Sequence, residues 1–337
     1  RMSGPVDAFG RPLRDLRVSV TDRCNMRCTY CMPAEVFGPD YAFVPREEIL
    51  TFEEIVRVVR IAAGLGVRKV RLTGGEPLLR RELPSLVRLL SAIPPLEDLA
   101  LTTNGLLLAG FAQELREAGL HRVTVSLDAL DDAVFRRLGG SRRGVADVLA
   151  GMEAARRCGL PVKVNCVVRR GLNEGEVLPL AEFCRSAGYT LRFIEYMDVG
   201  NHNRWQGSEV VPAAELRAVL DRRFGLVPLE PAAPGEVARR YRYADGCGEV
   251  GLIASVTEPF CRDCNRARLT ADGKLVTCLF AAEGVDLRGP LRSAKDDREL
   301  AEVVRGIWAG RADRYSELRG APLPDVRPKV EMSYVGG

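Results

Sequence analysis

Six of the ten cysteines fall into two groups of three, one towards each end of the 337-residue chain. The front trio has C-x3-C-x2-C spacing, and the back trio has C-x2-C-x13-C spacing. Ten cysteines in a chain of this length are too few for a disulfide scaffold, so clustered thiols indicate metal ligands first. In chain order the trios are Cys24, Cys28 and Cys31, and then Cys261, Cys264 and Cys278.

The front trio is suited to an iron–sulfur cluster. Three thiolates can hold three irons of a 4Fe–4S cube, which leaves the fourth iron open to a small molecule. Zinc takes four ligands, or three and a water, and no fourth Cys or His lies nearby in the sequence. Arg23 and Arg27 flank the trio and would stabilise thiolate charge. A zinc site, or a cysteine-rich loop without a metal, is the alternative.

The spacing of the back trio does not identify which metal it binds. Its spacing resembles half of a zinc ribbon, so the trio alone supports zinc about as well as an iron–sulfur cluster. Cys247 is a candidate fourth ligand.

A third motif, Gly74-Gly75-Glu76-Pro77, follows a strand-like run at residues 67–73. Its glycines let the backbone approach a ligand closely, and Glu76 offers an acceptor to an ammonium group. A plain turn is the alternative.

Strand and helix patterns alternate along the first two thirds of the chain, and these elements must position the motifs. Thr51-Phe52-Glu53-Glu54 has the form of a capping box at a helix start. Six strand–helix units in series predict a parallel sheet with right-handed crossovers, two units short of an eight-stranded barrel. We therefore predict an α/β fold, an incomplete (βα)6 TIM-like barrel. The predicted strands span residues 16–21, 67–73, 99–104, 122–128, 162–168 and 191–197, and further helices are predicted at 106–118, 144–158, 176–187 and 213–224.

The predicted strands alternate apolar and polar residues, whereas buried parallel strands usually read as continuous apolar runs. The apolar face must pack on the helices. The polar face, which includes Arg17, Arg71 and Lys163, is therefore predicted to line the barrel interior as a ligand chamber. An antiparallel sheet with one face in water is the alternative.

The pattern changes after Phe224. A proline-rich stretch at residues 228–235 predicts a linker, and Ala271-Asp272-Gly273 predicts a hairpin turn. We therefore divide the chain into a barrel at 1–227 and a β-rich extension at 228–337 that carries the second metal site; the family resemblance described below implies that this extension also binds substrate. Strands are predicted in the extension at 250–256, 266–270 and 274–278, and a helix at 299–308.

Composition and missing motifs exclude several functions. No run of eighteen apolar residues would span a membrane, and Arg1 to Gly10 lack the apolar core of a secretory signal, so we expect a cytoplasmic enzyme. A net charge of +4 is weak for a protein that grips duplex nucleic acid. Two histidines exclude HExxH proteases and most Ser–His schemes. Gly273-Lys274 lacks the Ser or Thr that would complete a Walker loop.

The front trio, with Tyr30 before its last cysteine, resembles the radical S-adenosylmethionine superfamily. Gly74–Pro77 resembles the loop that binds the methionine amino group there. Two trios in one chain resemble one family in particular, the GTP 3′,8-cyclases of molybdenum-cofactor biosynthesis. The likeness extends from Asp15–Cys24 to Gly336-Gly337, and Met26 stands where phenylalanine is common.

The resemblance implies two 4Fe–4S clusters with three cysteine ligands each, S-adenosylmethionine as cofactor and GTP as substrate. It implies an external one-electron donor and neither a membrane nor a nucleic-acid partner, and it leaves a homodimer open. The implied cofactor contacts are Tyr30, Gly75, Glu76, Ser126 and Met197. The implied substrate contacts are Arg17, Arg71, Thr102, Lys163, Arg266, Ala267 and Arg268, and the implied catalytic residues are Arg17, Gly336 and Gly337.

The implied reaction is the first step of molybdenum-cofactor biosynthesis. A 5′-deoxyadenosyl radical takes hydrogen from C3′ of GTP, and the product is (8S)-3′,8-cyclo-7,8-dihydroguanosine 5′-triphosphate. The family's Gly-Gly tail enters the active site, although the residues alone favour a frayed tail at Gly336-Gly337. The competing functions are a peptide-modifying radical enzyme with an auxiliary cluster and a zinc-stapled RNA-binding module. The sequence lacks the clustered basic and aromatic stripe expected of the second.

Overall fold

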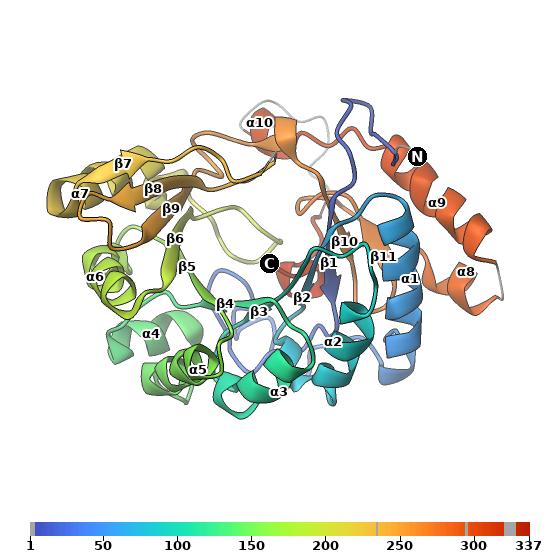
Figure 1. Ribbon diagram of the computed structural model, residues 1–337, viewed down its shortest axis with the longest axis horizontal. Helices are drawn as coiled ribbons and strands as arrows, with labels where there is room; N and C mark the ends of the chain where they lie inside the picture. The colour runs from blue at the N-terminus through green and yellow to red at the C-terminus, as the bar shows by residue number, and fades with distance from the viewer. Residues whose placement is uncertain (1–3, 234, 294–295, 320–327) are drawn as a thin grey trace.

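A curved twelve-stranded sheet forms the centre of the molecule (Figure 1), and its strand order is β12-β11-β10-β1-β2-β3-β4-β5-β6-β9-β8-β7. The computed structural model describes residues 4–233, 235–293, 296–319 and 328–337.

Six parallel strands in chain order make the main wall of the sheet. This confirms the incomplete parallel barrel, and the antiparallel alternative is wrong. The strands are β1 (Asp15–Ser19), β2 (Lys69–Thr73), β3 (Asp98–Thr103), β4 (Arg122–Ser126), β5 (Val162–Val168) and β6 (Thr190–Glu195).

Helices cover the outer face of this wall (Figure 1). The predicted capping box is present, because the Glu54 amide donates to Thr51 Oγ1 and the Thr51 amide donates to Glu54 Oε2, at 3.2 and 2.8 Å. The helix predicted at 106–118 is interrupted, since a 3₁₀ turn at Leu108–Gly110 precedes a shorter α-helix. The helices are α1 (Phe52–Gly64), α2 (Leu83–Ser91), α3 (Ala112–Glu117), α4 (Asp132–Gly139), α5 (Val145–Arg157), α6 (Val177–Ala187) and α7 (Ala213–Phe224).

The C-terminal strands extend the same sheet at both edges. β9 pairs parallel with β6, and β10 pairs parallel with β1, while the outer strands pair antiparallel. The predicted linker begins inside β7 and then joins β7 to β8. The predicted hairpin turn is confirmed between β10 and β11, where Gly273 has a φ of +86°. These strands are β7 (Leu226–Pro228), β8 (Arg239–Tyr243), β9 (Glu249–Ile253), β10 (Arg266–Leu269), β11 (Lys274–Val276) and β12 (Val285–Asp286).

Four further helices follow: α8 (Arg288–Arg292), α9 (Asp297–Ala309), α10 (Tyr315–Leu318) and α11 (Met332–Val335). The last of them brings the C-terminus inside the curve of the sheet (Figure 1). Within the described residues, no helix is both long and apolar enough to cross a membrane.

Burial along β5 and β6 follows the predicted period of two, whereas β3 and β4 each bury three consecutive residues. In β5, Val162, Val164 and Val168 are buried, whereas Lys163 and Asn165 between them are partly exposed. Burying each such apolar side chain contributes about 1.5–3 kcal/mol, so this alternation fixes which face meets the helices. The polar side chains are left on the concave face.

Candidate active site

Three arginines on adjacent strands form the first row of the concave face. Arg17 on β1 is in register with Arg268 on β10 and with Arg71 on β2. Neighbouring strands lie about 4.8 Å apart, so the three side chains project from adjacent positions on one face. The predicted alternation thus brings together guanidinium groups that lie up to 251 residues apart in the chain.

Two further rows lie on the same face. Thr102 on β3, Thr124 on β4 and Lys163 on β5 share one register. Ser126 at the end of β4, Asn165 in the middle of β5 and Arg192 near the start of β6 share the other. The Arg192 guanidinium donates its Nε–H to Asn165 Oδ1 at 2.9 Å.

Several polar atoms of these rows are buried without a partner. The Nε atoms of Arg17 and Arg71 and the hydroxyl of Thr102 have no hydrogen-bond partner in the described part of the chain. Leaving a buried polar group unpaired costs about 1–3 kcal/mol. All three residues are predicted substrate contacts, and an anionic ligand would supply the acceptors that they lack.

The charge balance of the concave face also favours an anion. Burial lowers the pKa of Lys163 to about 8, with a further contribution from the nearby Arg192. Burial, together with Arg17 and Arg266, lowers the pKa of Arg268 to about 9. Cations held close to one another in a buried space destabilise their own charged forms, and a bound polyanion would relieve this.

The glycine-rich loop after β2 packs directly on the segment that leads into the front trio. The Gly75 amide donates to the Thr21 carbonyl at 2.9 Å, and the Glu76 amide donates to the Arg23 carbonyl at 2.8 Å. A Cβ atom at Gly75 would collide with the Arg23 carbonyl, so glycine is needed here for contact within the chain. Its predicted contact with the cofactor stays a prediction.

The Glu76 carboxylate is occupied by protein donors. It accepts from the Thr103 hydroxyl at 2.7 Å, from the Asn104 amide at 2.8 Å and from the Leu78 amide at 3.0 Å. Burial raises its pKa to about 7. Glu76 therefore ties the loop to the end of β3, and its role as an acceptor for an ammonium group stays a prediction.

The front thiols have an environment that suits the ligands of a cluster. Cys24 Sγ accepts from the Met26 amide at 3.4 Å and from Asn104 Nδ2 at 3.8 Å, as a cluster thiolate would. Burial raises the pKa of Cys24 to about 11, and it also raises the pKa values of Cys28 and Cys31. Bound iron would supply the positive charge that such thiolates need.

Among the described residues, no three His, Cys, Asp or Glu side chains converge as ligands of one metal ion.

Arg23 and Arg27 serve the loop more than the thiolates. The Arg23 guanidinium lies over the Phe43 ring at 5.1 Å. Arg27 donates to the carbonyls of Phe37 and Cys24, at 2.7 and 2.8 Å. The charge of Arg27 also acts to lower the pKa of Cys24, against the larger effect of burial, and the predicted stabilisation of thiolate charge by this pair stays a prediction.

The back trio lies beside β10 and has a cationic environment. Cys264 Sγ accepts from Arg311 Nη2 at 3.1 Å and from Arg266 Nη2 at 3.4 Å. Burial alone would raise the pKa of Cys264, but these two arginines hold it below its ordinary value. Cys278 Sγ accepts from the Phe280 amide at 3.5 Å. These donors suit the thiolates of a second cluster.

Cys247 is exposed in the turn between β8 and β9, at the opposite edge of the sheet from β10. Its amide donates to Asp245 Oδ1 at 3.0 Å. The structure therefore does not bring the candidate fourth ligand to the back trio.

The C-terminal tail is ordered, so the frayed tail is wrong. The Gly336 carbonyl accepts from Arg268 Nη1, and the Gly337 carbonyl accepts from the Thr73 hydroxyl at 3.5 Å. The Tyr334 hydroxyl donates to Asp272 Oδ1 at 2.6 Å. These contacts place the two glycines between the ends of β2 and β10, next to the arginine row.

Comparison with known proteins agrees with these features. Residues 18–184 match the model of the radical SAM superfamily, and residues 189–317 match that of Molybdenum Cofactor Synthesis C. The chain is 54% identical to the GTP 3′,8-cyclase of Acidothermus cellulolyticus over the whole of both chains. It is 47% identical to that of Staphylococcus aureus, with 98% of each chain covered.

The chain belongs to the GTP 3′,8-cyclase family. Among solved structures, Streptococcus suis SuiB bound to its precursor peptide SuiA is similar in fold, with a TM-score of 0.63 and 14% identity. That alignment covers 94% of this chain and 68% of SuiB. The cofactors of a radical SAM GTP 3′,8-cyclase are S-adenosylmethionine and two 4Fe–4S clusters. The two cysteine trios have the donors to hold the two clusters.

Other predicted contacts of this cyclase family lie as follows. Ser126 and Met197 are half-buried, at the end of β4 and just after β6. Ala267 is buried and in register with Leu16, so its side chain lies on the apolar face and only its main chain faces the chamber. The predicted roles of all three stay predictions.

Sequence analysis missed Asp128, which anchors the front loop of the cyclase. The Tyr30 hydroxyl donates to Asp128 Oδ2 at 2.7 Å, and the Val167 amide donates to Oδ1 at 2.8 Å. Burial raises the pKa of Asp128 to about 6. Arg192 and Asn165 were also missed, although both occupy polar positions of alternating strands and so carried the same signal as Lys163.

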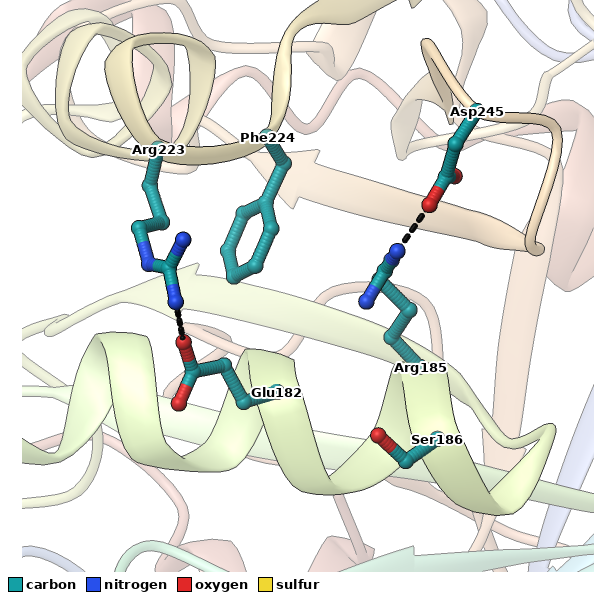
Figure 2. A pocket seen from close by; sticks show the side chains of 6 residues that line it. All are labelled: Glu182, Arg185, Ser186, Arg223, Phe224 and Asp245. Carbon is teal, nitrogen blue, oxygen red and sulfur yellow. Dashed lines mark hydrogen bonds and ion pairs between the residues drawn. The ribbon is translucent and has the colours of Figure 1, made fainter.

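A cavity of about 520 Å³ lies outside the barrel, between α6, α7 and the β8–β9 turn. Figure 2 shows its two ion pairs, Arg223 with Glu182 and Arg185 with Asp245. Its cations already have carboxylate partners, in contrast to those of the chamber.

Proposed function

We propose that this chain converts GTP to 3′,8-cyclo-7,8-dihydro-GTP, with the triphosphate bound by the arginine rows of the concave face. One observation carries the proposal: buried, unpartnered guanidinium and hydroxyl groups line the chamber between two cysteine trios. Family membership supports the same reaction.

The chamber has enough donors for a triphosphate without a Walker loop. A charge-assisted hydrogen bond contributes about 1.5–3 kcal/mol. Contacts from Arg17, Arg71, Lys163 and Arg268 would give about 6–12 kcal/mol before ordering costs, against about 8 kcal/mol for micromolar binding.

The remaining roles concern positioning and water exclusion. The front trio would hold the first cluster and the back trio the second. The first cluster, together with S-adenosylmethionine, would supply a 5′-deoxyadenosyl radical for hydrogen abstraction. Arg17 and the two tail glycines would lie beside the bound triphosphate and are the proposed catalytic residues. Because Gly336 accepts from Arg268, the tail and this arginine hold each other in place and help to exclude water. An external one-electron donor completes the reaction.

The direct test is anaerobic incubation of the iron-loaded protein with S-adenosylmethionine, dithionite and GTP, followed by mass analysis of the nucleotides. We expect the cyclised nucleotide and 5′-deoxyadenosine. Other nucleotides and peptides, added in place of GTP, should give no modified product. A modified peptide would favour the competing radical enzyme, and zinc without inorganic sulfide would favour the RNA-binding module.

A Cys24→Ser variant tests the front trio separately. It should leave S-adenosylmethionine intact under strong reductant. Normal cleavage by this variant would refute the ligand assignment.

A further inference from the structure

A buried ionic network joins the N-terminal segment to the end of α9, next to the back trio. Its buried members are Asp7, Arg11 and Arg311, which are 6%, 4% and 4% exposed, and Arg311 also pairs with the partly exposed Asp313 at 3.4 Å. Asp7 Oδ2 accepts from Arg11 Nε at 2.6 Å and from Arg311 Nη1 at 2.9 Å. The Arg311 guanidinium also lies over the Trp308 ring, with 4.7 Å to the ring centroid.

This network contacts two cysteines of the back trio, Cys261 and Cys264, and the residue that precedes the third. Arg11 Nη1 donates to the Cys261 carbonyl at 2.6 Å. Arg311 donates to the Cys264 carbonyl at 2.9 Å, to Cys264 Sγ at 3.1 Å, and to the Thr277 carbonyl, next to Cys278, at 3.0 Å. One guanidinium therefore links two ligand segments that lie 13 residues apart in sequence.

Packing alone does not account for the bond to the sulfur. A charged N–H donor on a ligating thiolate stabilises negative charge there, and an iron–sulfur cluster becomes more negative when it is reduced. A buried positive charge beside the cluster therefore favours the reduced form, and the buried Asp7 carboxylate opposes it. The two residues should thus act on the cluster in opposite directions.

We propose that Arg311 is a positioning residue for the second cluster, which orients Cys264 and raises the reduction potential of the cluster, with Asp7 and Arg11 holding Arg311 in place. The proposal rests on the proposed assignment of the back trio as cluster ligands. It concerns the reduction potential of that cluster and not the identity of the substrate.

The test uses the full chain with Cys24, Cys28 and Cys31 all changed to Ala, so that only the second cluster is present. Its reduction potential is measured by anaerobic titration monitored by electron paramagnetic resonance. Arg311→Gln should lower the potential and speed the release of iron to a chelator, and Asp7→Asn should raise the potential. Arg305→Gln, which removes a pair with Glu302 on the outside of α9, should leave the potential unchanged.

Opposite shifts separate an electrostatic role from structural damage, which would move both variants the same way. Equal potentials in parent and Arg311→Gln, or shifts of the same sign in Arg311→Gln and Asp7→Asn, overturn the proposal. If Arg311→Gln does not load iron, the reduction potential is measured in Arg311→Lys, which should show a smaller decrease than that expected for Arg311→Gln. An unchanged potential in Arg311→Lys overturns the proposal. If the parent binds no iron–sulfur cluster, the ligand assignment itself fails, and the proposal fails with it.

Discussion

Replacing Arg71 by methionine should change stability and substrate affinity in opposite directions. Arg71 lies between Arg17 and the β3 strand on the concave face. Burial lowers its pKa well below the ordinary value, and the like charges of Arg17 and Arg192 lower it further. The free protein therefore bears a cost for keeping this cation charged, and bound GTP would repay it.

The magnitudes follow from the strand spacing. Side chains on adjacent strands place unit charges about 5–8 Å apart, and at an effective dielectric constant of about 20 they repel by about 2–3 kcal/mol. Water and salt in the chamber reduce this, so we expect a gain of about 1–3 kcal/mol in the unfolding free energy without GTP. For a chain of this length, that raises the melting temperature by about 1–4 °C. Loss of a charge-assisted contact of about 1.5–3 kcal/mol should weaken GTP binding about 10- to 150-fold.

The assay pairs anaerobic thermal unfolding of the iron-loaded, nucleotide-free protein with calorimetric titration of GTP. Arg71→Lys keeps the charge and should retain the lower melting temperature. Arg60→Met, at an exposed position of α1, is the matched control and should change neither quantity. A less stable Arg71→Met protein that binds GTP normally would refute the reasoning, since Arg71 would then stabilise the fold and not the substrate.

Three further variants test the supports of the site. Burial raises the pKa of Asp128 to about 6, so its contribution to stability is lost as pH rises through 6. The unfolding free energy of Asp128→Asn, measured in urea relative to that of the wild type, should therefore rise by up to about 3 kcal/mol between pH 4 and pH 7. A difference between the two proteins that does not change with pH would contradict this. In Glu76→Gln the side-chain NH2 group would face either the Thr103 hydroxyl or the Asn104 amide, which both donate to the carboxylate in the wild type, and one of these bonds would be lost. The variant should therefore lose about 1–3 kcal/mol of unfolding free energy, and an unchanged denaturation midpoint would count against the role of Glu76. Tyr334→Phe loses the bond to Asp272 that anchors the tail and should lower the rate of GTP cyclisation about 2- to 10-fold without changing the affinity for S-adenosylmethionine; a matching loss of that affinity would contradict a tail-specific role.

The sequence could predict the barrel and its polar chamber because both depend on local periodicity. A period of two in the strands, with helices between them, was sufficient to place Arg17, Arg71 and Lys163 on the concave face. Arg192 follows the same rule, because it lies between the buried Leu191 and Phe193, and it could have been predicted in the same way.

Long-range pairing and buried polar contacts were beyond such reasoning. Nothing local shows that β10 joins β1 in parallel across about 250 residues, or that Asp128 meets Tyr30. Glu76 was predicted to face a ligand because its motif says so, yet its donors come from β3, which only the folded chain brings near. Arg311 follows no motif, and its contacts arise from the packing of the N-terminal segment on α9.

The pairing of β1 with β10 also bears on the kind of substrate that can reach both trios. Cys24 lies five residues after the C-terminal end of β1, whereas Cys264 lies two residues before the start of β10, and the two strands run parallel. The trios therefore lie towards opposite ends of one strand pair. β1 has five residues and spans about 13 Å at about 3.3 Å per residue, with Arg17 at its middle. A group that is held by the arginine row and is in reach of both ends must be compact and strongly anionic, and these requirements favour a nucleoside triphosphate over an extended peptide.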